Sequence, residues 1–223
     1  GATSSGWRAS GQGRISCPGA EELCSKFRQK AGTERTRQAM NEDMRADIER
    51  ILLTEEEIQE KVKALGRQIT QDYKGKNLML VSVLKGSIAF MADLMRAIDL
   101  PLKIDFLSVS SYGASTSSSG TVEIRKDLDI DLHGVDLLIV EDILDSGRTL
   151  HKIIQLLKER GTASIKIACL LDKPERRVVP LSADYTCFDI PDRFVVGYGL
   201  DYDQHYRNLP YIGILKPAVY EKA

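Results

Sequence analysis

Two adjacent carboxylates, Glu141 and Asp142, follow an apolar run, and a polar turn comes soon after them in LLIVEDILDSGRTLHKII (137–154). The run DLLIVE predicts a buried strand at 136–141, and the apolar spacing after the turn predicts a helix at about 149–160. In open α/β sheets, ligands bind beyond the carboxyl ends of the strands. The sequence therefore predicts a binding site at this edge of the sheet.

The turn itself, Asp145–Thr149, suits a phosphate dianion. It presents several backbone N–H groups and two hydroxyls at the positive end of the following helix. The spacing of a Walker loop is absent, and Gly147 stands alone where a dinucleotide fingerprint has three glycines. Carboxylates beside an anion site indicate a ligand with a phosphate and a sugar diol, and they can also help to hold hydrated Mg²⁺. The alternative is that Asp145 and Ser146 only cap the helix.

The elements that must position this turn follow an alternating pattern. Thr54 and Glu57 have the spacing of a capping box, and the apolar residues after them form one helical face: Ile58, Val62, Leu65, Ile69 and Tyr73. Further strands are predicted at 78–83, 103–109, 164–171 and 194–198, and a further helix at about 87–98. Strands that alternate with helices indicate a mostly parallel sheet with right-handed crossovers. The predicted fold class is α/β.

A Ser- and Gly-rich tract, SSYGASTSSSGTVEIRK (110–126), interrupts this alternation and ends in an alternating strand, TVEIRK. Ser/Gly richness makes a chain flexible. A loop of this kind inside a compact domain is typical of a lid or a binding loop. A surface hairpin without function is the alternative.

The composition is that of a globular domain with an appendage. The chain has 223 residues, of which 43% are hydrophobic and 28% charged, and its net charge of −1 gives no reason to expect nucleic acid or a membrane as a partner. Four cysteines without C-x-x-C spacing favour free thiols over a disulfide frame or a zinc site. The three histidines show no pairing typical of a catalytic site.

The first 43 residues differ from the rest, because they are rich in Gly, Ser and Arg and show no periodic apolar face. We expect residues 1–43 to be a disordered leader and residues 44–223 to form the functional domain. An Arg- and Ser-rich start is also typical of organelle transit peptides. A leader, a linker or a remnant of cloning is the alternative.

The segment VEDILDSGRT resembles the phosphoribosyl-pyrophosphate-binding motif of the type I phosphoribosyltransferases, and more narrowly that of the short, bacterial-type hypoxanthine/guanine enzymes. Further motifs agree in order: LKGS (84–87), SSYG (110–113), LLDKPERR (170–177) and DRFVVGYGLDYDQHYRNLP (192–210). The resemblance extends from about Arg45 to the C-terminus. It implies a mostly parallel, twisted sheet flanked by helices, with a small hood and a flexible lid loop.

The resemblance also implies roles for the residues of the turn and of the base site. Glu141 and Asp142 would bind the ribose hydroxyls, and the loop Asp145, Ser146, Gly147, Arg148 and Thr149 would hold the 5′-phosphate. Asp145 matches the acid/base residue at N7 of the purine, and Lys173 matches the lysine that donates to O6.

The remaining motif residues match the purine stack, the pyrophosphate site, the lid and the metal site. Phe194 would stack on the base, and the backbone of Val195 would contact its edge. Lys85-Gly86, a turn that can be cis in this family, and Arg207 would bind pyrophosphate, and Ser111 and Tyr112 would belong to the lid. The magnesium ligands would be Glu141, Asp142 and Asp201.

The function so implied is the Mg²⁺-dependent transfer of a phosphoribosyl group to N9 of hypoxanthine or guanine, which yields IMP or GMP in purine salvage. The alternatives are a regulator that senses phosphoribosyl pyrophosphate and a transferase that prefers xanthine. The resemblance further implies a homodimer or homotetramer in the cytoplasm, or in a plastid or mitochondrion if the N-terminal segment is a transit peptide.

Overall fold

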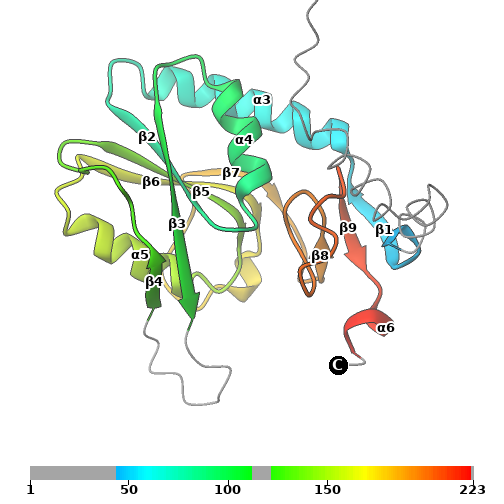
Figure 1. Cartoon of the computed structure of the whole chain (residues 1–223). Helices are drawn as coiled ribbons and strands as arrows, with labels where there is room; N and C mark the ends of the chain where they lie inside the picture. Colours follow the sequence, from blue (N-terminus) through cyan, green and yellow to red (C-terminus); the bar gives the residue numbers. More distant parts are fainter. Residues whose placement is uncertain (1–43, 112–121, 222–223) are drawn as a thin grey trace, which may run out of the picture. The chain divides into compact units, whose positions relative to one another are not determined.

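The computed structural model describes residues 44–111 and 122–221 (Figure 1), and the side chains of residues 110, 111, 122 and 123 are outside the description. The chain divides into two units, Gly1–Arg45 and Ala46–Ala223, and every element below belongs to the second. The predicted leader and the tip of the predicted lid lie outside the described residues. None of the described helices is long and apolar enough to cross a bilayer.

A six-stranded sheet forms the centre of the second unit, in the order β4-β3-β2-β5-β6-β7. All neighbouring strands are parallel except β3 and β4, which pair antiparallel. The prediction of an α/β fold with a mostly parallel, twisted sheet is therefore confirmed. The strands are β2 (Leu78–Val83), β3 (Lys103–Ser111), β4 (Val122–Lys126), β5 (Asp136–Leu144), β6 (Ser164–Asp172) and β7 (Tyr185–Asp189).

Helices cover both faces of this sheet (Figure 1). Side chains alternate along each strand, so that Leu80, Leu138 and Leu170 pack on one side while Met79 and Leu137 pack on the other. The first set packs with α3 and α4, and the second packs with α5. The helices are α3 (Glu55–Asp72), α4 (Ile88–Ala97) and α5 (Arg148–Lys158).

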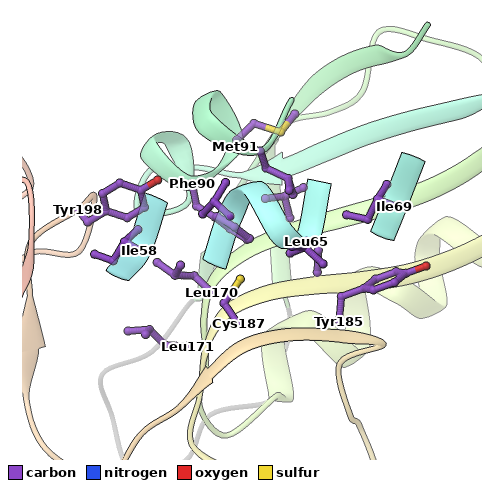
Figure 2. Close-up of a cluster of buried hydrophobic side chains, with 14 of the residues drawn as sticks. Ile58, Leu65, Ile69, Phe90, Met91, Leu170, Leu171, Tyr185, Cys187 and Tyr198 are labelled. Carbon is purple, nitrogen blue, oxygen red and sulfur yellow. The ribbon is translucent and has the colours of Figure 1, made fainter. Parts of the chain in front are cut away.

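The predicted capping box and apolar face of α3 are both confirmed. The Thr54 N–H donates to Glu57 Oε2 at 2.7 Å, and the Glu57 N–H donates to Thr54 Oγ1 at 3.2 Å. The apolar face is buried, as Figure 2 shows for Ile58, Leu65 and Ile69 against side chains of α4 and the sheet. This packing fixes α3 over the sheet.

A second sheet, which we call the hood, consists of β1 (Ile48–Leu53), β9 (Ile212–Leu215) and β8 (Val195–Val196) in the antiparallel order β1-β9-β8. The prediction of a strand over 194–198 is too long, because the chain turns at Gly197, which has φ +100°. Two short elements complete the fold, the 3₁₀ turn η1 (Pro174–Arg176) and the helix α6 (Pro217–Tyr220).

Candidate active site

The carboxyl ends of β2, β5, β6 and β7 meet at one edge of the sheet, because these strands run parallel. The segments that follow them carry most of the predicted site residues. Lys85 and Gly86 follow β2, the turn Asp145–Thr149 follows β5, Lys173 follows β6 and Phe194 follows β7. Residues more than 100 positions apart therefore reach one site.

The turn after β5 forms a small cavity of about 140 Å³ at the start of α5. It is lined by Glu141, Ile143, Leu144, Asp145, Ser146, Gly147, Arg148, Thr149 and Leu150. The residue before the helix is Gly147, at φ +76°, and no side chain caps α5. The alternative that Asp145 and Ser146 cap this helix is therefore wrong, and the first N–H groups of α5 have no helical partner.

The segment Arg177–Val179 packs against this turn. The Val178 N–H donates to Ser146 O at 3.2 Å, and a Cβ at Gly147 would lie 2.9 Å from Val179 Cγ2. Arg177 donates to the carbonyl oxygen of Leu144 at 3.2 Å, at the end of β5. The turn Asp145–Thr149 is thus held by packing and by hydrogen bonds from Arg177 and Val178.

Glu141 and Asp142 reach the edge from opposite faces of β5, because the strand continues to Leu144 and neighbouring side chains alternate. Glu141 lines the small cavity. Asp142 lies against Gly86, where an added Cβ would come within 1.7 Å of Asp142 Oδ2. Only glycine fits at position 86 with the carboxylate in this place.

Burial dominates the electrostatics of these two carboxylates. Burial, and then the charge of Asp142, raise the pKa of Glu141 well above its usual value. Burial raises the pKa of Asp142 to about 6, although the Ile143 N–H and the charge of Arg207 act in the opposite direction. Glu141 Oε2 is buried without a hydrogen-bond partner among the described residues. Such an atom is costly unless a ligand or water satisfies it.

Arg207 and Asp201 form an ion pair beside Asp142, with 2.8 Å between Arg207 Nη2 and Asp201 Oδ1. Arg207 also donates to Gly199 O at 2.8 Å, and the Gln204 N–H donates to Asp201 Oδ2 at 2.9 Å. These contacts hold the loop after β8 in a compact form. They place the guanidinium of Arg207 near the buried carboxylate of Asp142, where its charge offsets part of the rise in pKa that burial causes.

The same loop contacts the turn after β2. Gly199 has φ +101°, and an added Cβ there would lie 2.0 Å from Gly86 O. Lys85 Nζ donates to Gln204 Oε1 at 3.2 Å, and the peptide bond between Leu84 and Lys85 is cis. The structure therefore brings the predicted pyrophosphate residues Lys85, Gly86 and Arg207 to one place.

A larger cavity of about 410 Å³ opens beside the small one. Its lining residues are Ile143, Asp145, Lys173, Arg176, Asp192, Arg193, Phe194, Val195, Leu200 and Tyr220. Asp145 and Ile143 line both cavities, so the two are neighbours. Four of the predicted residues, Asp145, Lys173, Phe194 and Val195, meet here.

Lys173 is the buried cation of the larger cavity, with only 7% of its surface exposed. Its ammonium donates to Arg193 O at 2.7 Å and lies 3.5 Å from Asp192 Oδ1. A buried lysine with a free donor position can recognise a carbonyl oxygen on a ligand. Phe194 is 38% exposed, which is unusual for a large aromatic ring and fits a surface for stacking.

Sequence reasoning missed six of the residues that line this cavity, among them Tyr220, Arg176 and Asp192. Tyr220 stacks on Phe194 with 4.9 Å between ring centroids and 20° between planes, but it comes from a four-residue helix that has no periodic signal. Arg176 and Asp192 also line the cavity. One signal was available for Arg176, because it follows Lys173 by three residues, which is one turn of a 3₁₀ helix.

The lid is described only at its base, where Ser111 of β3 pairs with Val122 of β4. Tyr112 lies outside the described residues, as do the neighbouring lid residues 113–121. The roles of Ser111 and Tyr112 stay predictions.

The predicted metal site stays a prediction as well. Among residues 44–111 and 122–221, no three acidic, histidine or cysteine side chains lie close enough to form a metal cluster by themselves. The carboxylates of Glu141, Asp142 and Asp201 all lie at this edge, but Asp201 is engaged by Arg207 and Gln204.

A mostly parallel sheet with a hood, a small cavity at a helix start and a larger cavity next to it are the features of the type I phosphoribosyltransferase class. The family model of the phosphoribosyl transferase domain matches residues 51–203. The chain belongs to this family.

Comparison with individual proteins shows which members of this class the chain resembles. The chain is 56% identical over 178 residues to the hypoxanthine-guanine phosphoribosyltransferase of Bacillus subtilis, covering 80% of this chain and 99% of that protein. It is 54% identical over 182 residues to the bifunctional protein TilS/HprT of Listeria innocua, of which it spans only 28% while 82% of this chain is covered. A crystal structure of a hypoxanthine phosphoribosyltransferase from Staphylococcus aureus matches with a TM-score of 0.78 at 54% identity, covering 81% of this chain and 98% of that one.

Proposed function

We propose that this chain transfers the 5-phosphoribosyl group from phosphoribosyl pyrophosphate to N9 of hypoxanthine or guanine, releasing IMP or GMP and pyrophosphate. The observation that carries the proposal is the pair of neighbouring cavities joined by Asp145. The smaller one has the N–H donors for a phosphate, and the larger one holds a buried ammonium and an exposed aromatic ring. Relatives named for this activity support it.

Lys173 provides the selectivity for a 6-oxopurine. Its ammonium is a donor without acceptor capacity, so it matches the O6 atom of hypoxanthine or guanine. The 6-amino group of adenine would face that donor with another donor and leave both unpaired in a buried place. Xanthine carries the same O6, and Lys173 cannot separate it from guanine.

Asp145 exchanges the proton at N7. As N9 attacks C1′ of the donor, the purine loses or balances a proton at N7, and a carboxylate within hydrogen-bond reach can take it. Lys85 and Arg207 face the pyrophosphate as it departs, and their positive charges stabilise the negative charge that develops on it. Glu141 and Asp142 accept hydrogen bonds from the ribose hydroxyls.

The acidic residues of the edge also fit Mg²⁺. Glu141 Oε2 is an orphaned buried oxygen, and all the candidate donors are carboxylates, which Mg²⁺ prefers. Glu141, Asp142 and Asp201 would hold the ion together with water and donor oxygens, since Mg²⁺ usually binds only one or two carboxylates directly. When bound, Mg²⁺ neutralises charge on the leaving pyrophosphate.

The same comparisons support our proposal for the cellular role of the enzyme. Bacterial relatives with one catalytic activity in their names favour a purine salvage transferase over a sensor of phosphoribosyl pyrophosphate. They lend no support to a plastid or mitochondrial location, and we place the enzyme in the cytoplasm. A homodimer or homotetramer stays our prediction, to be measured by light scattering.

The test is nucleotide formation from phosphoribosyl pyrophosphate and Mg²⁺ with hypoxanthine, guanine, xanthine and adenine, each supplied separately. We expect activity with hypoxanthine and guanine and none with adenine. Activity with xanthine above both would assign the xanthine-preferring alternative. Binding of the donor without turnover of any base would identify a sensor instead of an enzyme.

A further inference from the structure

Arg176 bridges two carboxylates at the mouth of the larger cavity. Its Nε lies 2.7 Å from Asp145 Oδ1, and its Nη1 donates to the two carboxylate oxygens of Asp192 at 3.1 and 3.2 Å. Asp192 in turn lies 3.5 Å from Lys173 Nζ. The four side chains form a row of alternating charge along one wall of the cavity.

These residues come from different segments of the chain. Asp145 begins the turn after β5, Arg176 is the last residue of η1 after β6, and Asp192 follows β7. Arg176 and Asp192 therefore link Lys173, the proposed donor to O6, with Asp145, the proposed acceptor at N7, through a chain of ion pairs. O6 and N7 are neighbouring atoms on one edge of a purine, so their two protein partners must keep a fixed spacing.

The contact constrains the carboxylate of Asp145. Oδ1 faces Arg176 and is shielded from solvent, which leaves the second oxygen to meet a ligand. Within the part of the chain that the structure describes, Arg176 is the one charged side chain paired with Asp145. Helix capping does not hold Asp145 either, since no side chain caps α5.

We propose that Arg176 is a positioning residue, which orients Asp145 toward N7 of the base and sets its spacing from Lys173. The proposal rests on the function proposed above for Asp145. A guanidinium suits the task, because its donors are planar and fixed relative to one another, so that it can contact two carboxylates in a defined geometry. Arg176 does not itself touch the reacting atoms.

Stability gives little reason for this arrangement. The side chains of Arg176, Asp145 and Asp192 are 50%, 42% and 45% exposed, and exposed ion pairs contribute little to folding. Removal of Arg176 should therefore leave a folded protein, in which an effect on turnover can be measured.

The experiment measures steady-state kinetics of Arg176→Ala, Arg176→Lys, Asp145→Asn and the double variant with hypoxanthine. We expect Arg176→Ala to lower kcat about 10- to 100-fold, as for a misplaced catalytic group, with the KM for phosphoribosyl pyrophosphate little changed. Arg176→Lys should restore part of the loss, because it keeps the charge without the planar fork. Arg160→Ala is the matched control, since it removes the exposed Arg160–Asp127 pair and should leave kcat unchanged.

The double variant shows whether Arg176 acts by orienting Asp145 or affects turnover independently of it. If Arg176 acts through Asp145, then adding Arg176→Ala to Asp145→Asn should cause no further loss of kcat. A wild-type kcat in Arg176→Ala would overturn the proposal, and so would an equal fold-loss of kcat from Arg176→Ala in the wild type and in Asp145→Asn. Neither result would affect the proposed function, which nucleotide formation by the wild type tests separately. If Arg176→Ala did not fold, Arg176→Gln would take its place in the same cycle.

Discussion

Asp145 and Lys173 approach the larger cavity from the ends of neighbouring strands, and each has a different constraint. Lys173 is buried and bound to a backbone carbonyl, whereas Asp145 is partly exposed and held by one ion pair. In the proposed function, this donor and carboxylate together recognise one edge of the base. Replacing Asp145 and replacing Lys173 should therefore change different kinetic parameters.

Replacing Asp145 should affect the chemical step. We expect Asp145→Asn to bind phosphoribosyl pyrophosphate about as well as the wild type, because the phosphate loop depends on backbone N–H groups. Its kcat should fall by roughly 10²–10⁴, the usual range for the loss of an acid/base group. Calorimetry for the donor and a turnover assay measure the two effects, and full activity would remove Asp145 from the mechanism.

Replacing Lys173 should affect recognition of the base. Lys173→Ala removes the buried ammonium that would face O6, so the KM for hypoxanthine should rise by about tenfold or more. Donor affinity should change much less. Lys158→Ala, at an exposed lysine of α5, is the control for loss of charge. A loss confined to the donor would show that the O6 assignment is incorrect.

At the scale of elements, short segments far from the sheet edge support the cavity. α6 brings Tyr220 against Phe194, and Tyr202 contacts the same ring edge-on at 5.7 Å. These contacts fix a ring that would otherwise be free to turn, since Phe194 is 38% exposed. The segments that adjoin β8 and β9 therefore order an aromatic ring of the larger cavity.

Removing the stack should weaken base binding. We expect Tyr220→Ala to raise the KM for hypoxanthine about 3- to 10-fold, the equivalent of one aromatic contact, with the donor KM unchanged. Tyr220→Phe keeps the ring and should behave like the wild type. Equal kinetics for Tyr220→Ala and Tyr220→Phe would show that the stack has no role.

Asp105 of β3 holds the end of β4 and the segment that follows it. Burial alone would raise the pKa of its carboxyl, but the N–H groups of Asp129 and Phe106 and the ammonium of Lys126 outweigh burial and lower the pKa. The Asp129 N–H donates at 2.8 Å, and Lys126 Nζ lies 3.1 Å away. A lowered pKa in the folded state means that the ionised carboxyl stabilises the fold above its unfolded pKa.

The stability contribution of Asp105 should therefore depend on pH. We expect Asp105→Asn to lose about 1–3 kcal/mol of unfolding free energy at pH 7, and this difference should shrink as the pH falls through the acid range below about 4. Urea unfolding at several pH values measures it. Asp129→Asn, whose side chain is 82% exposed, is the control and should show little effect. A difference that is constant with pH would contradict the account.

At the scale of the whole molecule, the family match and the described fold both concern the region after the N-terminal segment. The family model begins at residue 51, and the described elements begin with β1 at Ile48. The described lining residues of the two cavities all lie between Glu141 and Tyr220. We therefore expect residues 1–43 to be dispensable for activity.

Deleting the N-terminal segment tests this division. We expect a chain that starts at residue 44 to keep its kcat, its KM values and its midpoint of thermal unfolding, because the sequence before it has no periodic apolar face with which to add to a core. Loss of soluble protein or of activity on deletion would show that the segment belongs to the functional domain.

Local patterns were sufficient for five strands of the central sheet and for α3, but they did not predict the sixth strand, β7. The strand at 78–83 was predicted with its observed bounds, and the capping box of Thr54 and Glu57 marked the start of α3 correctly. Both signals depend on neighbours in sequence, namely a continuous apolar run and a reciprocal pair of hydrogen bonds. The hood was expected only from the resemblance: local patterns predicted no strand at β9, which has four residues, too few for a period to be recognised, and gave β8 too long a range.

The sequence by itself determined which residues can do chemistry and at which strand ends they stand, since residue type and hydrophobic period are local properties. Tertiary structure alone decided how they meet. It placed Glu141 and Asp142 on opposite faces of β5, brought Tyr220 to Phe194, and paired Arg176 with Asp145 and Asp192. These contacts join distant segments, and their distances depend on how the strands and the hood pack, which no local pattern encodes.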